Sequence, residues 1–128
     1  SYSDKYLHDV KGDFSFNVDN VECPHLKPQE FGSHYGCKNV SVCDKNLSIE
    51  IFSAKEFSFH ASNYSTEQLL KTAHNYELKK EGVTYIYLDS QMSGVGTASC
   101  GQKLISKYRA KCKNVNSKFF IFLTDNND

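Results

Sequence analysis

Apolar and polar residues alternate along the first half of the chain in the manner of half-buried strands. The apolar positions of four such segments are Phe14, Phe16 and Val18; Val40 and Val42; Leu47, Ile49 and Ile51; and Phe57 and Phe59. Polar residues 44–46, between the second and third segments, indicate a hairpin turn. The pattern predicts a series of strands, with an antiparallel pair around this turn.

The second half of the chain adds one helix and two strands with apolar residues on both faces. Residues 65–73 change to helical spacing, and Ser65 followed by Gln68 is a capping-box pattern that starts a helix. Residues 83–88 and 119–123 carry apolar side chains on both faces, which predicts central strands of a sheet. The sequence therefore predicts an all-β fold, an antiparallel β-sandwich with one short helix.

Length and charge limit the classes of function. The chain has 128 residues, enough for one domain, with 15 basic and 15 acidic residues. A net charge of zero argues against a nucleic-acid binder, which needs a basic excess. Apolar runs fall short of the roughly 18 residues of a membrane helix. The chain lacks a starting Met and a signal-peptide pattern, so we expect a processed or excised piece.

The five cysteines indicate reduced thiols rather than a disulfide framework, because the count is odd and the spacings are irregular. This usage favours a cytoplasmic location and leaves a secreted or periplasmic parent open. A zinc site built from Cys23, His25, His34 and Cys37 is an alternative, although the segment between them is irregular. The interpretation that the residues favour is loop histidines and buried thiols.

Residues 89–102 form the best candidate site, a long loop rich in glycine and small hydroxyl residues. The motif Gly94-Val95-Gly96 lacks the spacing of phosphate-binding loops, so a plain surface loop is the alternative. Ser99-Cys100-Gly101 suggests a nucleophile, but no base can be assigned beside it. The pattern alone predicts a β-rich domain with a site here and does not define a reaction.

Several segments resemble the end of large β-galactosidases of glycoside hydrolase family 2. Residues 28–35, PQEFGSHY, resemble the family signature P-Q-E-N-G-x-H/R. Residues 57–65, FSFHASNYS, resemble F-x-F-S-A-x-x-Y-[ST], and Leu69, His74 and Glu77-Leu78 continue the likeness. Residues 88–96 resemble the L-D-x-x-x-x-G-V-G loop, which ends in a matching Ser99-Cys100-Gly101. The resemblance is colinear over residues 1–123.

This resemblance implies the C-terminal portion of a galactose-mutarotase-like supersandwich over residues 1–123, followed by a flexible tail at 124–128. The family's catalytic glutamates lie in a barrel upstream, as do its usual Mg and Na sites, so neither catalytic nor metal residues and no cofactor are expected here. The resemblance instead implies a loop on the active-site wall that contacts the galactoside. Its residues are Met92, Gly94, Val95, Gly96, Ser99 and Cys100. The chain has no Trp, so stacking of sugar on this loop is in doubt.

The resemblance thus predicts a non-catalytic domain of a β-galactosidase acting on terminal galactosides such as lactose, with the catalytic barrel as its partner. A free-standing carbohydrate-binding module is the alternative, since 8 tyrosines and 9 phenylalanines allow an aromatic platform. A mutarotase-like epimerase would instead need an acid–base pair, His34 with Glu30 or His60 with Glu56. We also expect an isolated partial sandwich to self-associate through open sheet edges.

Overall fold

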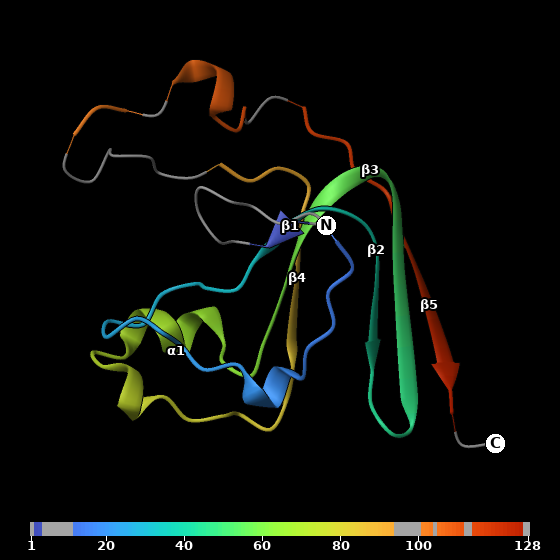
Figure 1. Ribbon diagram of the computed structural model, residues 1–128, viewed down its shortest axis with the longest axis horizontal. Coiled ribbons are helices and arrows are strands. Elements are labelled where there is room, and N and C mark those ends of the chain that lie inside the picture. Colours follow the sequence, from blue (N-terminus) through green and yellow to red (C-terminus); the bar gives the residue numbers. More distant parts are fainter. Residues whose placement is uncertain (1, 4–11, 94–100, 104, 112–113, 127–128) are drawn as a thin grey trace.

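A computed structural model describes residues 2–3, 12–93, 101–103, 105–111 and 114–126 (Figure 1). The strands form one five-stranded antiparallel sheet. They are β1 (Tyr2–Ser3), β2 (His34–Cys43), β3 (Leu47–Ser62), β4 (Tyr85–Asp89) and β5 (Phe119–Asp125). The helices are α1 (Thr66–Lys71) and short 3₁₀ turns at Val18–Asn20, Asn75–Glu77 and Ser106–Tyr108. The predicted all-β class with one short helix is confirmed, and the sheet is consistent with one layer of a sandwich.

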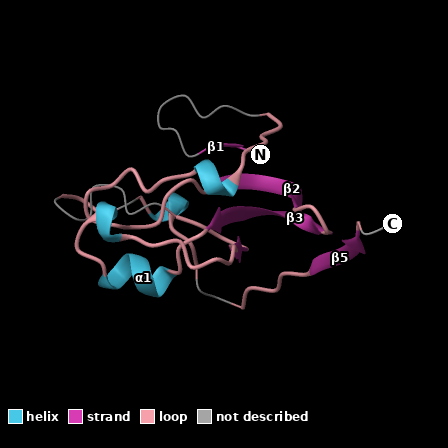
Figure 2. Ribbon diagram, turned by 90° about the horizontal axis from the view of Figure 1, so that it is seen from below, coloured by secondary structure: helices cyan, strands magenta, loops and turns pink. Residues whose placement is uncertain are grey.

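The main strands and the helix α1 lie toward opposite ends of the structure when it is seen from below (Figure 2). The hairpin β2–β3 and the strand β5 make up one end, and α1 with the neighbouring turns makes up the other. None of the helices in the described ranges is long and apolar enough to cross a membrane.

The hairpin β2–β3 confirms the predicted turn at residues 44–46. The carboxylate of Asp44 accepts hydrogen bonds from the backbone N–H groups of Asn46 at 2.7 Å and Leu47 at 2.8 Å. These two donors favour the ionised carboxylate and lower the pKa of Asp44. The predicted third and fourth strands are one continuous strand, β3, which arches over beside β2 (Figure 1).

Strand β3 is the centre of the sheet, and this corrects two predictions. On one side β3 pairs with β2; on the other it pairs with β5 over Leu47–Ser53 and with β4 over Ser58–Ser62. Within the described residues, β4 and β5 have a partner strand on one side only and are not central. The apolar faces of β4 are instead covered by different layers, Ile86 and Leu88 facing the sheet core and Tyr87 facing α1.

Residues 14–18 do not form the predicted strand. The ring of Phe16 stacks on His34 with centroids 5.5 Å apart, and Phe14 lies against the same ring at 5.1 Å. Val18 begins a 3₁₀ helix whose N-cap is Asn17, with the Asn17 side chain accepting from the backbone of Asp19. The alternation of residues 14 and 16 therefore reflects packing on one histidine ring rather than strand pairing.

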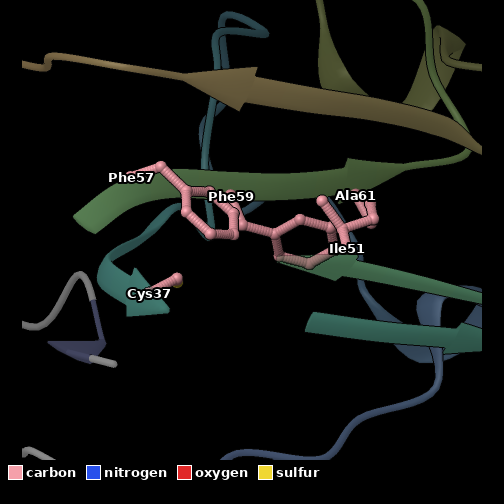
Figure 3. Close-up of a cluster of buried hydrophobic side chains, with 5 residues drawn as sticks. All are labelled: Cys37, Ile51, Phe57, Phe59 and Ala61. Atoms are coloured by element: carbon pink, nitrogen blue, oxygen red, sulfur yellow. The ribbon is translucent and has the colours of Figure 1, made fainter. Parts of the chain in front are cut away.

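Two separate clusters of buried residues form the core. The sheet cluster contains Cys37, Ile51, Phe57, Phe59 and Ala61, and Figure 3 shows these side chains gathered on β2 and β3. The helix cluster contains Cys23, Phe31, Tyr64 and Leu69 and binds α1 to the segment before β2. Complete burial of one such side chain stabilises a fold by about 1.5–3 kcal/mol. The helix cluster, which contains Phe31, therefore contributes to the position of residues 28–35.

Helix α1 begins where the sequence predicts. The hydroxyl of Ser65 accepts from the backbone N–H of Gln68 at 3.2 Å and donates to the carboxylate of Glu81 at 2.8 Å. The side chain of Gln68 does not close the box; it bonds to Lys79 and Glu81 instead. These contacts join the start of α1 to the chain that leads into β4.

Candidate functional site: the root of the glycine-rich loop

Of the six residues predicted to contact sugar, the structure describes Met92. The other five, Gly94, Val95, Gly96, Ser99 and Cys100, lie outside the described residues. Met92 follows β4 and its side chain is 48% exposed. The Ser33 hydroxyl donates a weak hydrogen bond to the Met92 sulfur, with oxygen and sulfur 3.6 Å apart. The root of the loop therefore lies against segment 28–35, which carries the family-like signature.

A shallow cavity of about 370 Å³ opens beside Met92. It is lined by Gln91, Met92, Lys107, Arg109, Ala110 and Lys111. The sequence contains no acidic residue between Ser90 and Thr124. The loop root and the turn at Ser106–Tyr108 thus meet around a polar, positively charged hollow.

Segment 28–35 is held against β3 and β4 by a buried histidine. His60 is 7% exposed, and neither of its buried ring nitrogens makes a hydrogen bond of standard geometry within the described residues, although the Gly32 backbone is close enough to favour the charged ring. Phe31 meets the His60 ring edge-on at a centroid distance of 5.8 Å, and Tyr87 stacks on it at 5.5 Å. Desolvation lowers the pKa of His60, although Glu30, Asp89 and the backbone of Gly32 favour the charged ring.

A hydrogen-bonded layer surrounds this group on the α1 side. The hydroxyl of Tyr87 accepts from the backbone N–H of Thr66 at 3.2 Å and from the Thr66 hydroxyl at 3.0 Å. These bonds hold the Tyr87 ring that stacks on His60.

Two of the alternative sites predicted from sequence, the zinc site and the pair of His60 with Glu56, do not assemble. The described residues contain no group of three or more His, Cys, Asp and Glu side chains arranged to hold a metal ion, so the four candidate zinc ligands do not converge. The Cys23 thiol instead lies near the backbone carbonyl oxygens of His25 at 3.7 Å and Gln29 at 3.9 Å. The electrostatic neighbours of His60 are Glu30, Asp89 and His34, so its predicted pairing with Glu56 is not present.

Sequence reasoning did not identify the group formed by Phe31, His60 and Tyr87. A signal was present, because Phe31 and His60 are the positions at which residues 28–34 and 57–65 differ from the signatures given above, Asn and Ser respectively. The structure brings these two departures into ring contact. Each departure could be noticed separately, but their contact depends on the path of residues 28–35 across β3.

A second hollow lies on the opposite side of the sheet. This open groove has a volume of about 1570 Å³ and is lined by β2, by residues 12–19 and by parts of β3 and β4. Phe14 and Phe16 border it and are 38% and 43% exposed. The groove therefore offers partly exposed aromatic rings, at a distance in the fold from the segment that holds Met92.

Comparison with known proteins connects the chain to one group. A family model described as the β-galactosidase small chain matches residues 1–121. The β-galactosidase of Staphylococcus xylosus is 38% identical over 120 residues, which cover 93% of this chain and 12% of the relative. That of Actinobacillus pleuropneumoniae is 35% identical over 109 residues, 85% of this chain and 10% of the relative. That of Streptococcus thermophilus is 38% identical over 98 residues, 75% of this chain and 10% of the relative.

The chain thus spans about a tenth of the length of these relatives. The match extends from β1 into the first residues of β5 and includes both the signature-like segment and the loop that follows Met92. Taken together, these findings identify the chain as a member of the β-galactosidase small-chain family.

Proposed function

We propose that this chain is a non-catalytic domain of a larger family 2 glycoside hydrolase that acts on terminal β-D-galactosides such as lactose. Its role is to stabilise the catalytic barrel and to supply residues 92–101 to the wall of the active site. The observation that carries the proposal is the small-chain match over residues 1–121 in a chain about a tenth as long as its relatives. The catalytic glutamates and the parent's Mg and Na ions then belong to the rest of the polypeptide.

The surroundings of Met92 support a role in carbohydrate binding. Its side chain is about half exposed and borders the cavity described above. Segment 28–35 supports the root of the loop through Ser33, so the loop starts from a fixed position. Glycines in the loop would let the backbone approach a ligand closely.

The test is thiol protection in the full-length polypeptide. Cys100 lies in the proposed wall and Cys43 is an exposed thiol at the end of β2, so the chain contains its own control. Galactose at about ten times its Kd is expected to slow maleimide labelling of Cys100 roughly tenfold. Labelling of Cys43, followed on its own peptide by mass spectrometry, should keep the same rate. An unchanged rate at Cys100 would contradict the loop's role in the site.

The domain assignment has a separate test. An antibody raised against this chain should detect a native polypeptide several times heavier than 14.5 kDa. That band should co-fractionate with β-galactosidase activity from the source cells. A band at the mass of the chain itself would contradict the assignment.

A free-standing carbohydrate-binding module is the second candidate. Phe14 and Phe16 favour it, because they present partly exposed rings along the groove of about 1570 Å³. Saturable binding of galactose by the isolated chain, lost on Phe16→Ala, would support this function. Calorimetry that detects no binding would leave the domain assignment as the better account.

The cysteines support a reducing compartment, the cytoplasm, for the parent protein. Cys23 is a buried free thiol and Cys43 an exposed one. An exposed thiol on a strand is prone to oxidation in a secreted protein. Fractionation of source cells with the same antibody tests this location.

A further inference from the structure

The buried ring of His60 is the feature of the structure that the proposed function leaves unused. Buried imidazole nitrogens usually find a hydrogen-bond partner, and a buried polar group without one is costly. His60 is 7% exposed and neither nitrogen makes a hydrogen bond of standard geometry within the described residues. The contacts that the structure gives this ring are aromatic, with Phe31 and Tyr87.

The packing around His60 joins three segments of the chain. Phe31 belongs to segment 28–35, Tyr87 belongs to β4, and His60 itself belongs to β3. The Phe31 and His60 rings meet at an interplanar angle of 69°, and the His60 and Tyr87 rings stack at 23°. Tyr87 is fixed in turn by its two hydrogen bonds from Thr66 at the start of α1. The His60 ring is therefore packed between Phe31 of the signature-like segment and Tyr87 of the sheet.

The same segment reaches the root of the loop two residues after Phe31. The Ser33 hydroxyl contacts the sulfur of Met92 at 3.6 Å. Gly32 between them adopts a φ of +70°, a conformation that directs the chain sharply and that other residues adopt at a cost. Where Phe31 sits on His60 thus determines where Ser33 meets Met92.

We propose that His60 is a positioning residue. Its ring fixes the position of Phe31 and thereby holds Ser33 against Met92 at the root of the active-site loop. The inference rests on the proposed function of that loop. It assigns to His60 no contact with the galactoside, so its effect is on the affinity for galactoside rather than on the chemical step. Protonation of the ring would bring a charge into the contact with Phe31 and weaken that contact.

Three titratable side chains and one backbone group face the ring and set this response. Glu30 from segment 28–35 and Asp89 from β4 favour the charged ring, as does the backbone of Gly32. His34 from β2 disfavours it, and burial outweighs the groups that favour it. The ring is accordingly neutral at pH 7, and its contact with Phe31 should weaken as the pH falls.

The test compares His60 with His74 in the full-length β-galactosidase. His74 is a matched control because it also stacks on a tyrosine, Tyr76, at 5.2 Å and 12°, but on the surface and remote from Met92 in the fold. His60→Ala should raise KM for lactose between about 2-fold and 30-fold, the range for a residue that acts through packed neighbours. kcat should change less, and His74→Ala should leave both constants unchanged.

Two further variants separate positioning from simple stability. His60→Phe retains an aromatic ring at this position, so it should restore KM. It should also remove the rise in KM that we expect of the wild type below pH 6.5. Ser33→Ala removes the contact to Met92 without disturbing the core and should raise KM as His60→Ala does. If His60→Ala does not fold, the pH dependence of KM in the wild type and in His60→Phe tests the positioning role instead.

The outcomes distinguish this inference from the proposed function. A wild-type KM in both His60→Ala and Ser33→Ala, or identical pH profiles in the wild type and His60→Phe, would overturn the positioning role. If Cys100 is nevertheless protected by galactose, the loop's function stands and only the role of His60 fails. If Cys100 is not protected, the proposed function itself fails.

Discussion

Ile51 on β3 lies directly opposite Ile121 on β5, yet Ile51 is 2% exposed and Ile121 is 54% exposed. Two identical side chains in one register pair thus have opposite environments. Neighbouring apolar residues of β5 share the exposure of Ile121, namely Phe120, Phe122 and Leu123, on both faces of the strand. An edge strand of this kind presents unpaired backbone groups together with apolar surface, which favours association.

The first prediction is that the isolated chain self-associates through β5. Phe122→Lys places a charge on the exposed face of the edge strand and should shift the chain toward monomer, because burying a lysine there is costly. Sedimentation velocity over a concentration series measures the shift. Leu70→Lys on α1, at a position 73% exposed, is the control and should leave association unchanged. A wild-type chain that sediments as a monomer at all concentrations would contradict the prediction.

The second prediction concerns the centre of the sheet cluster. Ile51→Ala removes a fully buried side chain and leaves a cavity, so it should lower the free energy of unfolding by about 2–5 kcal/mol. Ile51→Val removes one methylene and should cost about 0.5–1.5 kcal/mol. Urea denaturation measures both values. Val83→Ala, at a position 54% exposed, should change the free energy by less than about 0.5 kcal/mol. Equal effects at positions 51 and 83 would show that the cluster is not a core.

The third prediction concerns the start of α1. Ser65→Ala removes the acceptor for the Gln68 N–H and the donor to Glu81, and should destabilise the chain by about 0.5–2 kcal/mol. Ser65→Asp keeps an N-cap acceptor but faces the Glu81 carboxylate, so it should recover only part of the loss. Thermal unfolding followed by circular dichroism gives the order of the three proteins. A Ser65→Asp variant equal to the wild type would show that the bond to Glu81 contributes little.

The fourth prediction concerns acid stability. Burial lowers the pKa of His60 below its ordinary value of 6.5, so the unfolded chain binds a proton there more readily than the folded chain. Stability due to this group should therefore be complete above pH 6.5 and decline as the pH falls from 6.5 through the lower folded-state pKa. His60→Phe cannot titrate and should show a smaller decline over the same window in urea denaturation. Parallel pH profiles for the two proteins would contradict the assignment of the lowered pKa.

Local sequence patterns were sufficient to predict those features that depend on contacts between neighbouring residues. The turn at residues 44–46 and the helix start at Ser65 follow from side chains that bond to their own neighbours, Asp44 to Leu47 and Ser65 to Gln68. Such contacts depend on a few consecutive residues, so their patterns were interpreted correctly.

The local sequence patterns did not determine which distant segments pack against each other. An apolar run such as residues 119–123 predicts burial on both faces but does not identify what covers it, and the structure places this strand at an edge. The alternation of Phe14 and Phe16 arises from packing on His34, a residue distant in sequence. The sequence predicts a candidate site in a loop, and that prediction stays open; the ring contacts of His60 depend on tertiary packing that no single segment encodes.

The pairing of β5 also bears on the order in which the chain assembles. Strands β2 and β3 are joined by a short turn, so their hairpin forms after the closure of a small loop. β5 pairs with the first half of β3, which lies far earlier in the chain, and this closure carries a larger entropic cost and a slower rate. Until it happens, the outer edge of β3 at Ile51 is uncovered and β5 is unpaired. The folding chain therefore passes through a stage with two unpaired, aggregation-prone strand edges. A chaperone or an early-folding neighbouring domain would have its largest effect on the yield of folded protein at this stage.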